Sequence, residues 1–304
     1  MNNHSSYHGS ALLIVLWAIA LMSFAVLGLV KFMEIGLTES ASQSKNFRAM
    51  QLAESGLALG LHPQLEKEDS HLRQDLGSSE SFAVTLKSEG ARLNINFLLL
   101  NNKRSDLIDL FQSWKVNDGE IYKLADHLMD WVDEDSLKRL NGAENEDYTK
   151  LGFPGYPPNR PFQSLEEMEL VPGMEFLAEA RPDWKEYFTV WGDGKLDVNE
   201  APAELIAVVC QVGSLPAEMF VNRRLGSDGE KGTSDDFEYT EMAQVRSALG
   251  LSESLFKTVE SRITLKSNYR RIVSVGRIGN YERSLAVVVQ LNTNPVQYLT
   301  WIEY

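Results

Sequence analysis

The chain of 304 residues carries 29 basic and 43 acidic residues, which gives it a net charge of -14, and it contains one cysteine. An acidic surface repels phosphate backbones, so this charge argues against nucleic-acid binding and suits the binding of divalent cations. A single cysteine excludes an intrachain disulfide, and the apolar run around Cys210 predicts that its thiol is buried.

The first predicted element is a membrane-spanning helix. The residues from Ala11 to Val30 carry no charge, and Lys31 ends this apolar run. About 20 residues of helix span a hydrocarbon layer of about 30 Å, whereas the apolar core of a cleavable signal peptide has about 7–15 residues. We therefore expect the segment to stay in the protein as an anchor. Long domains are translocated largely regardless of flanking charges, so the head after the anchor is predicted to lie outside the cytoplasm.

The same helix is predicted to continue beyond the membrane. Apolar or small residues recur at helical spacing from Glu34 to Leu61, and the first proline of the chain is Pro63. Anchor and extension together form a predicted helix over residues 10–62, about 75 Å long. Such a rod suits a filament subunit, whose apolar half packs among its neighbours and whose amphipathic half carries a globular head.

The N-terminal sequence resembles those of type IV pilins and type II secretion pseudopilins, which begin with a short leader. Here the leader, residues 1–9, ends in Gly9 and precedes SALLIVLWAIAL. The resemblance implies that prepilin peptidase cleaves between Gly9 and Ser10 and methylates Ser10. Most members have Glu five residues past the cleavage site, where this chain has Ile14. In lacking this Glu, the chain resembles the minor pseudopilin K family, whose members lie at the filament tip. An ordinary signal anchor is the alternative.

The head is predicted to be α+β. Residues 81–97, SFAVTLKSEGARLNINF, alternate around SEG and predict a hairpin, and RRIVSVGRIG and ERSLAVVVQLN predict two strands joined at GNYE. Helices are predicted in SDLIDLFQSW, with Ser105 as the N-cap, and in GEIYKLADHLMDWVDED. The resemblance implies a small pilin-like antiparallel sheet, residues 63–97 and 266–304, with a large helical domain, residues 98–265, inserted in it.

Two segments of the head have similar sequences, ARLNIN and GKLDVNEAPAELIAVV. The second, with Asn199, Ala201 and Pro202 ahead of a helix, resembles the family's start of a sterile-alpha-motif-like (SAM-like) helical fold. Similar phrases occur in DNA-binding helix-hairpin-helix modules, which need a glycine-rich hairpin and nearby basic residues to hold phosphate. An acidic head beyond a membrane does not fit that use, so no nucleic-acid partner is expected.

The most specific head motif lies in residues 126–148, DHLMDWVDEDSLKRLNGAENEDY. It resembles a signature of the pseudopilin K family at these positions: Asp130, Trp131, Asp133, Asp135, Gly142, Ala143, Glu144 and Tyr148. Carboxylates at close range raise one another's pKa unless a cation neutralises them, and calcium takes six to eight oxygen ligands. The family binds calcium in this domain, so the resemblance implies calcium as a cofactor. The candidate ligands are Asp130, Asp133, Asp135, Glu144 and Asp147. The alternative is a solvated acidic loop whose side chains point apart.

A second acidic stretch, residues 225–239, carries Asp228, Asp235 and Asp236 around two glycines. These carboxylates are weaker metal candidates, because a flexible insertion explains the composition equally well.

The sequence contains no HExxH spacing, no G-x-S-x-G elbow and no phosphate-binding glycine loop, so no enzyme is predicted. The predicted function is that of a minor pseudopilin, anchored in the inner membrane by one span with its C-terminal head in the periplasm. It would initiate or cap a type II secretion pseudopilus for protein export. The resemblance implies other minor pseudopilins, in a tip heterotrimer, the major pseudopilin and prepilin peptidase as partners. The alternative is a signal-anchored periplasmic module that binds a cation or a protein and joins no filament.

Overall fold

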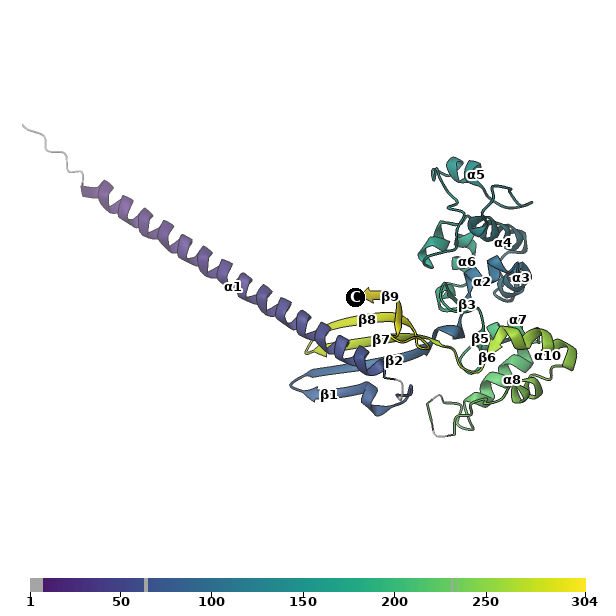
Figure 1. The fold of residues 1–304 in the computed structure, drawn as a ribbon. Coiled ribbons are helices and arrows are strands. Elements are labelled where there is room, and N and C mark those ends of the chain that lie inside the picture. Colours follow the sequence, from purple (N-terminus) through teal and green to yellow (C-terminus); the bar gives the residue numbers. More distant parts are fainter. Residues whose placement is uncertain (1–7, 63–64, 231, 234) are drawn as a thin grey trace, which may run out of the picture.

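A computed structural model describes residues 8–62, 65–230, 232–233 and 235–304, with side chains described from residue 12 onward. A long helix carries a small sheet against its C-terminal half, and a helical unit lies beyond the far end of that sheet (Figure 1). The predicted α+β class, with a long N-terminal helix and a helical domain inserted in an antiparallel sheet, is confirmed.

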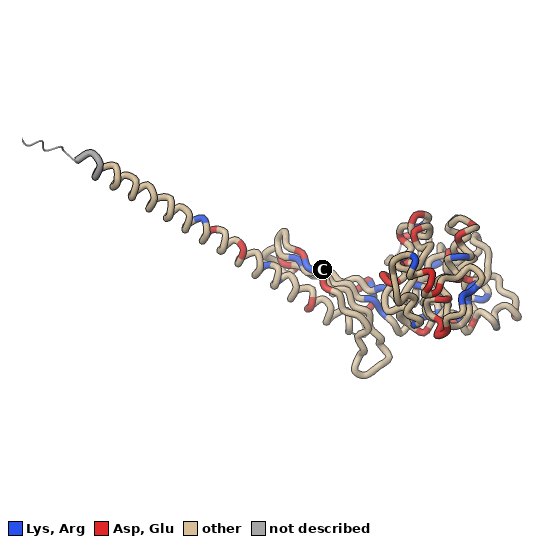
Figure 2. Tube along the Cα trace, turned by 90° about the horizontal axis from the view of Figure 1, so that it is seen from above, with Lys and Arg blue, Asp and Glu red and all other residues tan. Residues whose placement is uncertain are grey.

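The N-terminal helix α1 runs without interruption over His8–Gly60, where the sequence predicts residues 10–62. No charged residue interrupts it ahead of Lys31 in the described part of the chain (Figure 2). Its apolar half is exposed, with Ile14 68% and Phe24 73% accessible. Among the described residues, this helix alone is long and apolar enough to cross a membrane.

The sheet has five antiparallel strands in the order β1-β2-β7-β8-β9. Their bounds are Arg73–Gly77, Glu80–Ser88, Tyr269–Ile278, Tyr281–Gln290 and Gln297–Glu303, in chain order. The predicted C-terminal hairpin is confirmed, since β7 and β8 pair from Tyr269 opposite Gln290 to Ile278 opposite Tyr281.

The hairpin predicted within residues 81–97 is wrong. β2 forms its hairpin with the preceding strand β1, and the chain leaves the sheet at the SEG sequence. There Glu89, 1% exposed, accepts hydrogen bonds from Arg271 of β7 at 2.9 and 3.0 Å. The next strand, β3 (Leu93–Asn94), pairs instead with β4 (Phe188–Thr189) in the helical unit. The contact of Glu89 with Arg271, 182 residues away along the chain, thus outweighs the local alternation of apolar and polar residues.

The helical unit consists of two similar halves. Each half begins with a two-residue strand that pairs in parallel with a strand at its own end: β3 with β4, and β5 (Leu196–Asp197) with β6 (Ile263–Thr264). The first half holds α2 Ile95–Leu100, α3 Arg104–Ser113, α4 Asp118–Val132, α5 Asn145–Lys150 and α6 Met174–Ala180. The second half holds α7 Ala203–Cys210, α8 Ser214–Arg224, α9 Met242–Ala248 and α10 Glu253–Val259.

Short 3-10 helices at Ser70–Leu72, Glu89–Ala91, Glu166–Leu170, Trp184–Glu186 and Glu260–Arg262 complete the described elements.

Local details of this unit differ from the sequence predictions in two places. α3 starts at Arg104, so its N-cap is Lys103 rather than Ser105. No side chain accepts a capping hydrogen bond there. The helical core includes Leu93 and Ile95, so the unit begins earlier than residue 98.

The similarity between the segments ARLNIN and GKLDVNEAPAELIAVV has a structural basis. The side chain of Asn94 caps α2 by accepting a hydrogen bond from the backbone N–H of Phe97 at 3.1 Å. The side chain of Asn199 donates to the carbonyl oxygens of Tyr239 and Leu265, each at 2.9 Å. Pro202 is the N-cap of α7. The lone thiol of Cys210 is buried and its pKa is raised to about 12 by that burial.

The sheet and α1 share a small core of their own. α1 crosses β2, β7 and β8, and its own residues Ala49 and Ala53 are fully buried against the sheet. Gly276 of β7 lies directly under this crossing, where an added Cβ would overlap the carbonyl oxygen of Ala49. The helix therefore approaches the strand as closely as backbone atoms permit.

Gly276→Ala should lower the free energy of unfolding of the sheet region by about 1–3 kcal/mol, because the new methyl group pushes α1 off β7. Gly36→Ala is the matched control, since nothing lies within 4 Å of its added Cβ. Denaturant unfolding of the purified chains measures both. Equal stability of the two variants would contradict the close approach.

Candidate functional site: the acidic loop after α4

The acidic loop, residues 133–147, is held by an aromatic cluster beneath it. α4 places Trp131 at 0% exposure, where its ring stacks on Phe162 with centroids 5.2 Å apart. Tyr148 of α5 meets the same indole edge-on at 5.9 Å. Trp131 and Tyr148 thus anchor the two ends of the loop, which explains their places in the sequence signature.

Gly142 has a specific steric role in this loop. An added Cβ there would overlap Oδ2 of Asp130, which is itself fully buried at the end of α4. The neighbouring Ala143 is 3% exposed. The loop backbone therefore folds directly over the Asp130 carboxylate, and only glycine leaves room for it.

Arg139 neutralises two of the candidate calcium ligands. Its Nη1 donates to Asp130 Oδ1 at 2.6 Å and also to Asp133 Oδ2, while its backbone N–H donates to Asp130 Oδ2 at 3.2 Å. Burial raises the pKa of Asp130, and the hydrogen bonds from Arg139 oppose that rise. This arginine is not part of the sequence signature, although a basic residue within an acidic loop is a visible signal.

Two further candidate ligands, Asp147 and Asp135, accept hydrogen bonds from other residues of the acidic loop. Asp147 Oδ2 accepts from Lys138 Nζ at 2.9 Å and from the backbone N–H of Glu144 at 3.1 Å. The Lys138 hydrogen bond is the main reason that the pKa of Asp147 lies below its usual value. Asp135 Oδ1 accepts from the backbone N–H of Leu137 at 2.7 Å.

Glu144 is a buried candidate that no cationic side chain of the described residues neutralises. It is 8% exposed, and its Oε1 atom is buried with no hydrogen-bond partner, as is Oδ1 of Asp133. Desolvation, followed by the charges of Asp130, Asp133 and Asp135, raises the pKa of Glu144 to about 7. Within the described residues, no three acidic, histidine or cysteine side chains are close enough to hold a metal ion in this geometry.

The second acidic loop is organised by its own hydrogen bonds. Asp235 Oδ2 accepts from Ser227 N at 2.6 Å and Ser227 Oγ at 2.7 Å, and these bonds hold the pKa of Asp235 far below its usual value. Asp236 accepts from Gly232 N at 2.7 Å, and Asp228 from Glu230 N at 2.8 Å. Residues 231 and 234 of this loop lie outside the described part.

The predicted cleavage site lies at the start of α1. Most of the predicted leader, residues 1–7, is outside the described residues, and Gly9 and Ser10 belong to the first turn of the helix. Ile14, one turn further on, is exposed.

Glu144 should make the stability of the head depend on pH when a chelator removes divalent cations. Its folded pKa of about 7 exceeds its ordinary value of 4.5, so the protonated carboxyl favours the folded state. This stabilisation is complete below pH 4.5 and is lost as the pH rises through about 7. The free energy of unfolding should therefore fall by about 2 kcal/mol between about pH 5 and about pH 8.

Denaturant unfolding at a series of pH values measures this loss. Glu144→Gln should remove it, whereas Glu146→Gln, an exposed position of the same loop, should keep it. The same slope in both variants would show that Glu144 ionises normally.

Comparisons with known proteins agree with this architecture. Residues 91–182 match a family model described as type II secretion system (T2SS), protein K. A segment of 98 residues is 34% identical to the type II secretion system protein K of Klebsiella pneumoniae, and this match spans 32% of the chain and 29% of that relative.

The fold is also similar to a solved structure, the GspK-GspI-GspJ complex from the type 2 secretion system of enterotoxigenic Escherichia coli. The TM-score is 0.68 at 17% identity, over 88% of this chain and 99% of the solved one. Residues 91–182 thus form a domain of the type II secretion system protein K family, and the resemblance predicted from the sequence is confirmed.

Proposed function

We propose that the protein is a minor pseudopilin that caps the tip of a type II secretion pseudopilus, with two other minor pseudopilins beneath it. The observation that carries this proposal is the division of α1 into an exposed apolar half and a half that packs on the sheet. A protein K domain attached to such a helix is the combination that the proposed role requires. The head would lie in the periplasm and α1 in the inner membrane.

The tip position is supported by the place of the helical unit. This unit lies beyond the end of α1 and is wider than the sheet (Figure 1). In a filament whose helices pack side by side, so broad a head would collide with the subunit above it. At the end of the filament there is no such subunit.

Ile14 supports the same position. In pilin-like packing, the carboxylate usual at this place pairs with the terminal ammonium of the subunit above. A carboxylate without its partner in hydrocarbon is costly, and the topmost subunit has no partner to offer. An apolar side chain at residue 14 removes that cost.

Isolation of the tagged full-length chain from membranes of cells with a complete secretion system tests this function. We expect the chain to lack residues 1–9 and to carry two smaller pilin-like proteins in equal amounts. Ile14→Glu should still insert in the membrane but reduce protein export, whereas Ile14→Leu should leave export unchanged. A chain that begins at Met1 and is isolated alone would favour the signal-anchored module instead.

We further propose that the acidic loop binds calcium. Glu144 Oε1 and Asp133 Oδ1 are buried oxygens without partners, and a hard cation is the kind of ligand that such oxygens accept. Asp130, Asp135 and Asp147 would complete the oxygen ligands, and Arg139 would leave its place between Asp130 and Asp133. The bound cation would neutralise the loop and fix it over the aromatic cluster.

Calcium at about 1 mM should raise the melting temperature of the head, since a ligand that binds only the folded state stabilises it by mass action. Asp133→Asn combined with Glu144→Gln should remove most of this gain, and Glu146→Gln should retain it. Thermal unfolding with calcium and with chelator measures the difference. Identical curves for the unmodified chain would favour a solvated loop held by Arg139.

A further inference from the structure

Arg139 occupies the oxygens of two candidate calcium ligands. Both oxygens of Asp130 accept from it, Oδ1 from Nη1 at 2.6 Å and Oδ2 from the backbone N–H at 3.2 Å. The same Nη1 also donates to Oδ2 of Asp133. Because Asp130 is fully buried and the backbone at Gly142 closes over its Oδ2, a cation reaches this carboxylate only after the guanidinium has moved away.

Two buried oxygens of the same cluster are left without a partner by Arg139. Glu144 is 8% exposed and its Oε1 has no hydrogen-bond partner, and neither has Oδ1 of Asp133. The charges of Asp130, Asp133 and Asp135 all act on the Glu144 carboxyl, which therefore faces the other candidate ligands. Buried oxygens without partners are costly, and the guanidinium does not reach these two. A calcium ion, which takes six to eight oxygen ligands, can contact them together with the others.

The segment that carries Arg139 is not held by apolar packing. Leu137 and Leu140 are 77% and 94% exposed, so neither side chain contributes to the core. The segment of residues 136–140 is held instead by polar contacts, among them those of Arg139 and the ion pair that Lys138 makes within the loop at 2.9 Å. A shift of this segment would change little buried apolar surface, so its cost lies in the polar contacts.

Both ends of this segment are tethered. Ahead of it, the carbonyl oxygen of Asp135 accepts from Asn159 Nδ2 at 2.7 Å. After it, Asn141 Nδ2 donates to Asp126 Oδ2 at 3.1 Å. The residues between these tethers can therefore shift while α4 and α5 stay folded.

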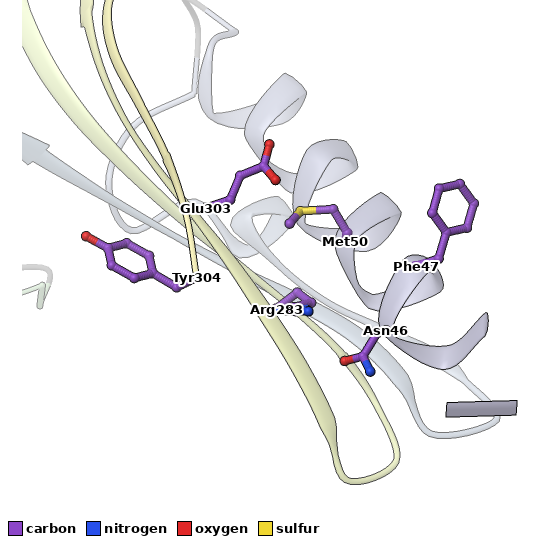
Figure 3. A pocket seen from close by; sticks show the side chains of 6 residues that line it. All are labelled: Asn46, Phe47, Met50, Arg283, Glu303 and Tyr304. Carbon is purple, nitrogen blue, oxygen red and sulfur yellow. The ribbon is translucent and has the colours of Figure 1, made fainter. Parts of the chain in front are cut away.

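The charged side chains beside α1 are placed differently. Figure 3 shows Arg283 and Glu303 lining an open hollow, where water can solvate both charges. Solvated charges of that kind gain little from an internal partner. The guanidinium of Arg139 is instead wedged between one fully buried and one partly buried carboxylate, as a bound cation would be.

We propose that Arg139 is a built-in competitor of calcium, which enters the acidic loop by displacing this side chain and thereby releases residues 136–140. The inference rests on the proposed calcium binding and describes how that binding is regulated. The displacement replaces one positive charge by two and supplies a ligand to the unpartnered oxygens of Glu144 and Asp133. The displaced guanidinium turns to solvent, where it keeps its charge.

The competitor sets the affinity of the site. The ion pairs of Arg139 with Asp130 and Asp133 have to be broken before both carboxylates ligate calcium, so their free energy is subtracted from that of binding. Extracellular modules bind calcium with dissociation constants of about 10⁻⁴–10⁻³ M, far more weakly than cytosolic buffers do. We expect a site weakened by Arg139 to fall in that range and to fill where calcium is plentiful, outside the cytoplasm.

Calcium titration of the full-length chain in detergent, after a chelator has removed divalent cations, tests the displacement. Arg139→Gln keeps a polar side chain but removes the charge. It should lower the calcium dissociation constant, measured by isothermal titration calorimetry, by roughly tenfold, which corresponds to about 1.4 kcal/mol. In chelator the same variant should melt about 2–4 °C below the unmodified chain, because Asp130 and Asp133 lose their partner. An arginine with a purely structural role would instead weaken calcium binding when it is removed.

Lys150→Gln is the matched control. Lys150 lies in the last turn of α5, is exposed, and its charge acts on Asp147 through space. The substitution removes the same unit of charge near the acidic loop without touching the contacts of Asp130 and Asp133. It should change the dissociation constant less than twofold.

Hydrogen exchange of the unmodified chain gives a second readout that does not depend on the folding of a variant. With calcium, the amides of residues 136–140 should exchange faster than with chelator, because the backbone N–H of Arg139 loses its hydrogen bond to Asp130. The amides of residues 142–148 should exchange more slowly, because Glu144 and Asp147 become ligands. Mass spectrometry of the peptides measures both segments in one sample.

Tighter calcium binding by Arg139→Gln, with faster hydrogen exchange in the first segment and slower exchange in the second, would support the displacement. Weaker binding by that variant, a change below twofold, or slower hydrogen exchange throughout residues 136–148 would overturn it. If the unmodified chain still binds calcium in those cases, the proposed calcium site stands. If neither chain binds calcium, the calcium site and its competitor fail together.

Discussion

The close contact between the backbones of α1 and β7 is the constraint on which the rest of the architecture depends. Gly276 has no side chain, so the carbonyl of Ala49 can lie directly on the strand, and small residues continue this contact at Ala53. The contact joins α1 and the five-stranded sheet into one packed unit, the stem. Because the sheet covers only one side of the C-terminal half of α1, the rest of the helix surface stays exposed.

The helical unit is tied to this stem by buried polar contacts as well as by two chain crossings. Glu89 binds Arg271 of the sheet and accepts a hydrogen bond from Thr189 of the helical unit at 2.5 Å. Asp197 accepts from Ser88 Oγ at 2.7 Å and from Ser267 N at 3.2 Å. A buried carboxylate at each crossing fixes the direction in which the unit leaves the sheet, away from the apolar half of α1 (Figure 1). Most of the head therefore lies beyond the end of the stem (Figure 1).

Periodicity allowed the long helix and the C-terminal hairpin to be predicted, because their local patterns agree with their tertiary surroundings. The segment after Ser88 could not be predicted in this way, since Glu89 is held by Arg271 from the other end of the chain. In the acidic loop, the signature identified residues that lie together in the structure, among them the buried Trp131. The role of Arg139 was missed, because spacing in a loop does not say which side chain turns inward.

The number and position of copies per filament distinguish a subunit at the tip from a subunit of the shaft. Counting labelled molecules on isolated pseudopili by electron microscopy gives both quantities at once. We expect one copy, at the end distant from the inner membrane. Labels distributed along the shaft at the frequency of the major subunit would contradict it.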